Sequence, residues 1–113
     1  MRRPKHTRKD VNHAQIVRMC RQLGIVVFDV ADVGGTCPDT FMVWRGRCLP
    51  VEIKAIGKRH DLTEGEKVGR DRCSYNGVSW VIAESIDDIL EAFAIIGNRT
   101  NEERLARHLL GGE

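Results

Sequence analysis

Three residues near the middle of the chain have the types and the spacing of a site for a divalent cation. They are Asp39, Glu52 and Lys54, and only Ile53 separates the last two. Mg²⁺ and Mn²⁺ prefer hard oxygen ligands, and two carboxylates, a backbone carbonyl and water make a suitable open site for them. A cation held in this way can polarise a phosphate and activate water. The pattern therefore predicts hydrolytic chemistry at Asp39 and Glu52.

Two strands are expected to bring these residues together. The sequence predicts two strands joined by a tight, Gly-containing turn, over Thr40 to Trp44 and Cys48 to Lys54. Side chains alternate between the two faces of a strand, so Glu52 and Lys54 share one face. If the turn pairs the strands antiparallel, Asp39 lies at the end of the hairpin where Glu52 and Lys54 also lie. We therefore expect two acids and a lysine to converge.

The simplest alternative is that Glu52 and Lys54 form only a solvated strand face, as most isolated pairs of this kind do. Here Glu52 stands between the apolar residues Val51 and Ile53, where a solvated charge is less expected. A second acid, Asp39, precedes the hairpin behind a Gly-rich loop. These neighbours favour a functional site.

The elements around the hairpin predict an α/β fold. Apolar spacing predicts a helix over residues 11–23, and short β-branched runs predict strands over 25–28 and 78–83. Asp10 is the expected N-cap of the first helix. Thr63 and Glu66 form a capping box that opens a helix ending near residue 76. The order is α-β-β-β-α-β followed by C-terminal helices from about residue 85, which predicts a mixed four-stranded central sheet flanked by helices.

The charge is unevenly distributed along the 113 residues. The first nine carry five Lys or Arg and no acid, which leaves 13 basic against 16 acidic residues in the rest. We expect residues 1–10 to be a basic arm on a single domain over 11–113, and such an arm suits a polyanionic partner, although short basic tails also serve solubility. No apolar run reaches the ~20 residues of a membrane helix. We expect no membrane partner and a cytoplasmic protein, in a bacterial or phage-infected host cell.

The four cysteines do not predict a metal or disulfide framework. No C-x-x-C pair is present, and no His stands at zinc-finger spacing from them. We expect reduced thiols that contribute to packing. Nothing indicates a small organic cofactor. The cysteines are Cys20, Cys37, Cys48 and Cys73.

Several segments together resemble the PD-(D/E)XK nuclease superfamily, and within it most closely the stand-alone VRR-NUC (virus-type replication-repair nuclease) domains. The resemblance spans about Val11 to Ala83. It rests on Gln15, Gly34-Gly35-Thr36-Cys37-Pro38-Asp39, Phe41-Met42-Val43-Trp44-Arg45-Gly46, Val51-Glu52-Ile53-Lys54 and Leu62-Thr63-Glu64-Gly65-Glu66.

The resemblance implies a restriction-endonuclease-like fold and a Mg²⁺- or Mn²⁺-dependent DNA endonuclease. Asp39, Glu52 and the backbone carbonyl of Ile53 would bind the metal, and Lys54 would position water or stabilise the developing charge. Two positions depart from the family pattern. Gln15 stands where many relatives have Glu, and Glu66 stands where Gln is usual. Both are candidates to contact the metal ligands without binding the metal directly.

Basic residues flank the predicted site in the sequence and are candidates for binding nucleic acid. Lys67 and Arg70 share a helix face at i, i+3 spacing. An exposed face of an amphipathic helix accounts for them equally well. The candidates are Arg2, Arg3, Lys58, Arg59, Lys67 and Arg70.

A Holliday-junction-resolvase-like activity on branched DNA is the sharper form of this prediction. A domain this small can cut two strands in concert only as a symmetric homodimer. Apolar residues near the C-terminus could contribute to the dimer, although covering the sheet is the alternative role for them. They are Phe93, Ile95, Ile96, Leu105, Leu109 and Leu110.

Two other classes of protein fit the same residues. A non-catalytic nucleic-acid-binding protein could use the arm and the basic helix face alone. A homo-oligomeric interaction module would keep the sheet without affinity for DNA. Within the nuclease class, RNA is an alternative substrate, because nothing in the sequence indicates recognition of the 2′-hydroxyl.

Overall fold

The computed structural model describes residues 11–94. The described elements are α1 (His13–Gln22), β1 (Val26–Asp29), β2 (Thr40–Trp44), β3 (Arg47–Ile53), α2 (Glu64–Tyr75) and β4 (Val81–Ala83). A further helix covers residues 86–94 of the described part. The predicted basic arm, the predicted N-cap Asp10 and the predicted last helix lie outside the described residues.

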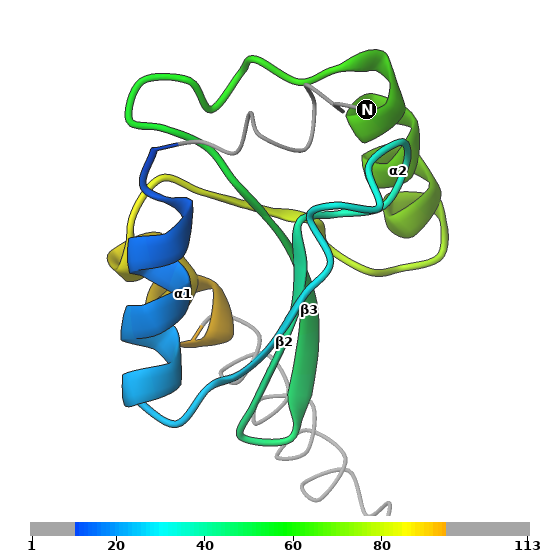
Figure 1. The fold of residues 1–113 in the computed structure, drawn as a ribbon. Helices are drawn as coiled ribbons and strands as arrows, with labels where there is room; N and C mark the ends of the chain where they lie inside the picture. The colour runs from blue at the N-terminus through cyan, green and yellow to red at the C-terminus, as the bar shows by residue number, and fades with distance from the viewer. Residues whose placement is uncertain (1–10, 95–113) are drawn as a thin grey trace, which may run out of the picture.

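The strands form one mixed four-stranded sheet in the order β1-β2-β3-β4. The pairs β1–β2 and β2–β3 are antiparallel, whereas β4 runs parallel to β3 after the crossover through α2. Helix α1 and the helix over 86–94 lie on one side of the sheet, and α2 lies on the other (Figure 1). The predicted α/β class, with a mixed sheet flanked by helices, is confirmed.

The main core lies between the sheet and the pair of helices that includes α1. From α1 it takes Ile16, Val17 and Cys20, which recur at helical spacing. Burying a large apolar side chain stabilises the fold by roughly 1.5–3 kcal/mol. Other members of this core are Ile25, Val27, Met42, Leu49, Val51, Ile53, Ala83, Ile89 and Phe93.

Phe93 is therefore a core residue. It is 4% exposed, and its ring meets Trp44 edge-on with centroids 5.6 Å apart. This burial excludes Phe93 from the dimer contacts considered for it, and confirms the alternative that it covers the sheet. The other apolar residues considered there, from Ile95 onward, lie outside the described residues.

Two element boundaries differ from the prediction. Strand β4 begins at Val81 instead of residue 78, because the amide of Val78 donates to the carbonyl of Cys73 and so closes the end of α2. Helix α1 begins at His13 with Asn12 at the N-cap position. No helix within residues 11–94 is long and apolar enough to cross a membrane.

Candidate divalent-cation site

The hairpin brings Asp39 to the end of β3, as the strand periodicity predicts. In the antiparallel register Thr40 pairs with Val51, so Asp39 stands opposite Glu52. Oδ2 of Asp39 accepts a hydrogen bond of 2.9 Å from the amide of Ile53. The carbonyl of Asp39 also accepts from the amide of Val30, at 2.8 Å, which ties the residue to the end of β1. Asp39 is thus held on both sides.

Glu52 is a buried carboxylate with an unused acceptor. It is 2% exposed, and its Oε1 has no hydrogen-bond partner among the described residues. A buried oxygen that accepts no hydrogen bond costs free energy, which a bound metal ion would offset. The orphaned Oε1, with Asp39 beside it, fits a site built to hold a cation.

Lys54 completes the predicted group and is joined by Glu66 from α2. The Nζ of Lys54 lies 3.0 Å from Oε1 of Glu66 and 3.9 Å from Oε2 of Glu52. The same Oε1 of Glu66 accepts from the amide of Thr63, at 2.9 Å, in the predicted capping box. Glu66 therefore caps its own helix and pairs with Lys54 at the same time, so the structure places it at the site.

The pKa values reflect the crowding of acids. Burial, the hydrogen bond to Glu66 and the nearby charges of Asp39 and Glu66 together raise the pKa of Glu52 to about 10, against the opposing effect of Lys54. Burial also raises the pKa of Asp39, although the amide of Ile53 opposes this. For Glu66 burial is outweighed by hydrogen bonds from Glu52, Thr63 and Lys54, which lower its pKa. Without a cation, Glu52 holds a proton that a metal ion would displace.

The approach of α2 to the loop before Asp39 depends on two glycines. A Cβ on Gly69 would overlap the carbonyl oxygen of Thr36 and would lie 2.9 Å from the ring of Trp80. A Cβ on Gly65 would lie 2.5 Å from the carbonyl oxygen of Gly35. Because both positions lack side chains, the loop rests directly on the helix. This contact sets the position of Asp39 relative to Glu66.

Gln15 does not reach the site. It lies on the exposed face of α1, because the buried face of the helix carries His13 and the core residues that follow it at helical spacing. The side chain of Gln15 forms no hydrogen bond or ion pair with another described residue. His13 instead lies with Nε2 3.1 Å from Oδ2 of Asp29, at the end of β1, and its charge lowers the pKa of Asp39 against the effect of burial.

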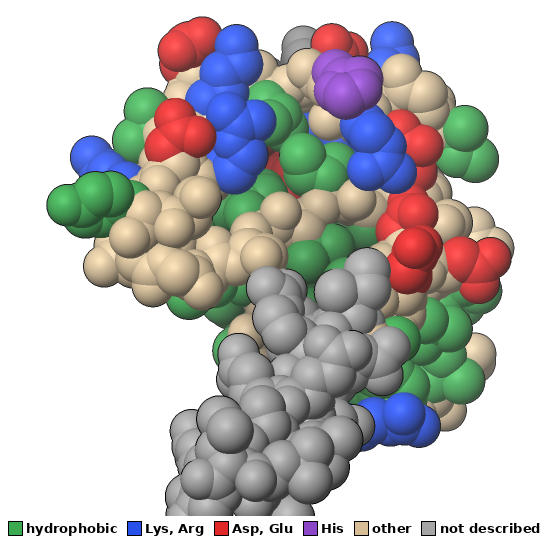
Figure 2. Space-filling view, turned by 180° about the vertical axis from the view of Figure 1, so that it is seen from behind, with side chains coloured by type: hydrophobic (Ala, Val, Ile, Leu, Met, Phe, Trp, Pro, Cys, Tyr) green, Lys and Arg blue, Asp and Glu red, His purple; other side chains and the backbone are tan. Residues whose placement is uncertain are grey.

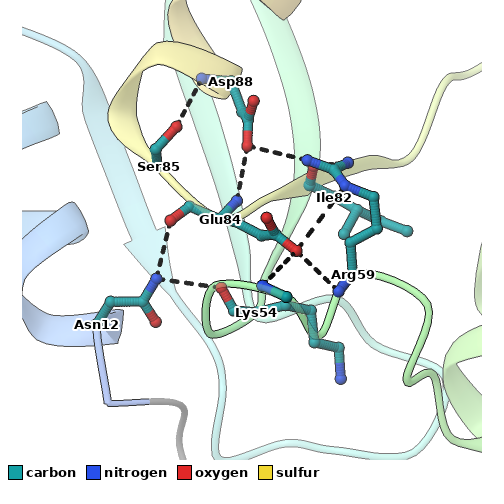
Figure 3. Close-up of polar contacts among 8 residues, drawn as sticks. Asn12, Lys54, Arg59, Ile82, Glu84, Ser85 and Asp88 are labelled. Carbon is teal, nitrogen blue, oxygen red and sulfur yellow. Dashed lines mark hydrogen bonds and ion pairs between the residues drawn. The ribbon is translucent and has the colours of Figure 1, made fainter.

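Asn12 is a supporting residue that sequence reasoning missed. Its Nδ2 donates to the carbonyl oxygens of Lys54, at 3.1 Å, and Glu84, at 3.0 Å, and Figure 3 shows this amide bridging the residues that follow β3 and β4. Its side chain makes no capping hydrogen bond to α1. An Asn just before a helix is typical of an N-cap. The sequence around Asn12 therefore indicated a helix cap and not the contacts with Lys54 and Glu84.

Arg59 is paired within the protein. Its Nη2 lies 3.1 Å from Oδ2 of Asp88, and its Nη1 donates to the carbonyl of Ile82 at 3.3 Å (Figure 3). The carboxylate of Glu84 accepts from the amides of Gly57, at 3.1 Å, and Arg59, at 2.9 Å. These contacts fasten the loop after Lys54 to the end of β4. Of the predicted nucleic-acid contacts in the described part, Arg59 is the least available.

The other described candidates are exposed. The side chains of Lys58, Lys67 and Arg70 are 61%, 47% and 42% exposed. Each lies within 4.0 Å of an acidic side chain of its own element or loop, but exposed pairs of this kind contribute little and are easily exchanged. Figure 2 shows Lys and Arg side chains at the upper end of the molecule, on either side of a strip of apolar side chains and backbone. Arg2 and Arg3 lie outside the described residues.

The donor set at the site is small. Within residues 11–94 no three His, Cys, Asp or Glu side chains are grouped as ligands of one ion, and the four cysteines are free thiols, with Cys48 exposed. The predicted site uses two carboxylates and leaves the remaining positions to a backbone carbonyl and water. Comparisons with protein-family models, curated proteins and solved structures found no match to this chain.

Proposed function

We propose that this protein is a Mg²⁺- or Mn²⁺-dependent nuclease that hydrolyses phosphodiester bonds of DNA. The observation that carries the proposal is the buried Oε1 of Glu52, which lacks a partner in the described residues and lies beside Asp39 and Lys54. Buried acids that crowd one another in this way are typical of sites that recruit a cation.

Each residue has a distinct proposed role. Asp39 and Glu52 hold the cation with the backbone carbonyl of Ile53. Lys54 presents a fixed ammonium beside the scissile phosphate, because Glu66 holds its Nζ at 3.0 Å. The chemistry that Mg²⁺ or Mn²⁺ supplies when bound is polarisation of the phosphate and a lower pKa of its water. Ile53 and Asn12 keep the ends of the strands in register, through hydrogen bonds of 2.9 Å to Asp39 and 3.1 Å to the carbonyl of Lys54.

The proposed substrate is duplex or branched DNA. Exposed Lys58, Lys67 and Arg70 provide contacts to phosphates on elements next to the site, and Arg2 and Arg3 would extend them from the arm. Symmetric cutting of a four-way junction requires a homodimer. We place the protein in the cytoplasm of a bacterial or phage-infected cell, where such DNA is accessible.

A cleavage assay with a matched pair of variants tests the proposal. Glu52→Gln replaces the buried carboxylate with an amide of the same shape, and Glu64→Gln makes the same change on α2 at a side chain that is 90% exposed. We would measure cleavage of a four-way junction, linear duplex, single-stranded DNA and RNA with Mg²⁺, with Mn²⁺ and with EDTA. We expect metal-dependent cleavage by wild type and Glu64→Gln that Glu52→Gln loses.

The substrates separate the remaining possibilities. Paired symmetric nicks in the junction support a dimeric resolvase, whereas cutting of linear duplex or single strands supports a nuclease without that selectivity. Cleavage of RNA but not of DNA would make RNA the proposed substrate. Binding of DNA without cleavage under any condition favours a non-catalytic binding protein. Self-association that is insensitive to salt, without affinity for DNA, favours an interaction module.

A further inference from the structure

The ammonium of Lys54 lies near the carboxylates of both Glu52 and Glu66. Its Nζ is 3.0 Å from Glu66 and 3.9 Å from Glu52, and the residue is 8% exposed. A buried ammonium is retained only where it is paired and hydrogen-bonded. Lys54 thus neutralises the side of Glu52 that faces α2, whereas the other oxygen of Glu52, Oε1, has no partner in the described residues.

Glu66 is not free to move toward a different cation. Its Oε1 accepts from the amide of Thr63 at 2.9 Å, and the hydroxyl of Thr63 accepts from the amide of Glu66 at 3.1 Å. Moving this carboxylate would break the cap of α2 and leave the amide of Thr63 without its acceptor. The helix therefore holds Glu66 at the distance that suits the Lys54 ammonium.

The charges at the site match one divalent cation. In the metal-bound site, where all three carboxyls are ionised, Asp39, Glu52 and Glu66 together with Lys54 carry a net charge of −2. One Mg²⁺ or Mn²⁺ neutralises this charge. A second divalent cation would leave the buried group at +2 and would approach the ammonium of Lys54, and repulsion between like charges is strong where water is excluded.

We propose that the site binds a single divalent cation, at Asp39 and Glu52, and that the ammonium of Lys54 takes the position of a second one between Glu52 and Glu66. This inference rests on the proposed metal site. It assigns Glu66 to holding that ammonium, and it predicts that removal of the lysine charge opens a second cation position.

The test counts bound Mn²⁺ on the full chain. Free Mn²⁺ is followed by its electron paramagnetic resonance signal during titration of wild type, Lys54→Met, the double variant Lys54→Met/Glu66→Gln, and Lys67→Met. Lys67 is the matched control, because it pairs with Glu64 at 3.5 Å on the exposed side of α2. We expect one equivalent in wild type and Lys67→Met, two in Lys54→Met, and one again in the double variant.

The outcomes separate this inference from the proposed function. Two equivalents in wild type, or one in Lys54→Met, would overturn the inference and leave the metal site standing. No binding of Mn²⁺ by wild type would overturn the metal site and the inference together. Thermal melts followed by circular dichroism establish that each variant is folded. If Lys54→Met does not fold, Lys54→Gln, which is uncharged but polar, carries the same measurement.

Discussion

The two faces of β3 are both buried from Leu49 to Ile53, but their side chains differ in chemistry. Leu49, Val51 and Ile53 point into the apolar core, whereas Glu52, with Lys54 just after the strand, points toward α2. Apolar burial stabilises the fold, and burial of charge costs free energy that pairing only partly returns. One face of β3 therefore stabilises the fold, whereas the other holds buried charged groups that cost stability and that we propose bind a cation.

The largest effect on cleavage is expected from Glu52→Gln, on the polar face of β3. Cleavage should fall about 100- to 1000-fold, because loss of a carboxylate ligand weakens binding of the cation that stabilises the developing charge. The free energy of unfolding at neutral pH should stay the same or rise, because glutamine is neutral in both states and removes the cost of protonating a carboxyl that the unfolded chain ionises. Rates measured with Mn²⁺ and urea denaturation check both halves. A large loss of stability would show that Glu52 is structural.

A substitution on the apolar face of β3 should lower stability without lowering activity. Leu49→Ala should lower the free energy of unfolding by about 2–5 kcal/mol, because it removes a side chain that is 2% exposed and leaves a cavity. Cleavage per folded molecule should be retained. Urea denaturation and single-turnover rates at a temperature where the variant is folded measure this. Loss of activity in the fully folded variant would contradict the separation of the faces.

The packing of α2 onto the polar face is tested by Gly69→Ala. The added Cβ would overlap the carbonyl of Thr36 and the ring of Trp80, so the free energy of unfolding should fall by about 1–3 kcal/mol. Val68→Ala, at an exposed position one residue earlier, is the control and should change little. Equal stability of the two variants in urea would show that the loop does not rest closely on the helix.

The polar face should also make stability depend on pH. The pKa of Glu52 is raised from 4.5 to about 10, so between these values the folded protein keeps a proton that the unfolded chain releases. Stability is therefore greatest below the unfolded pKa and falls as pH rises, by up to about 1.4 kcal/mol per pH unit without a divalent cation. The raised pKa of Asp39 acts in the same direction, and the lowered pKa of Glu66 acts against it.

Urea denaturation between pH 5 and pH 9 in EDTA measures this slope, which Glu52→Gln should largely remove. An unchanged slope in the variant would assign the dependence to other groups. Calorimetric titration of Mn²⁺ in buffers with different ionisation enthalpies should in addition detect release of a proton on binding.

The smallest effects are expected from the exposed lysine and arginine on α2. Lys67→Ala and Arg70→Ala should each weaken DNA binding uniformly across sequences, and each should lower the slope of log K against log salt by about 1. Stability should stay within about 0.5 kcal/mol of wild type, because both side chains are exposed. Fluorescence anisotropy at several salt concentrations checks this, and an unchanged slope would remove these residues from the DNA surface.

Local patterns in the sequence determined the elements and the central pair of carboxylates. Strand periodicity and a Gly-containing turn predict that Asp39 meets the end of β3, and the structure shows the hydrogen bond to Ile53. The capping box of Thr63 and Glu66 likewise needs only residues three apart. These features follow from the sequence because hydrogen bonding and alternation act over a few neighbouring residues.

Only the tertiary structure decided which distant residues support that pair. Asn12, and not Gln15, contacts the strand ends, because the buried stripe of α1 sets the rotation of the helix. Arg59 is paired with Asp88 across the sheet end, and Glu66 reaches Lys54 because Gly69 admits the loop against α2. Such contacts depend on how whole elements pack, and a single sequence carries no local signal for that packing.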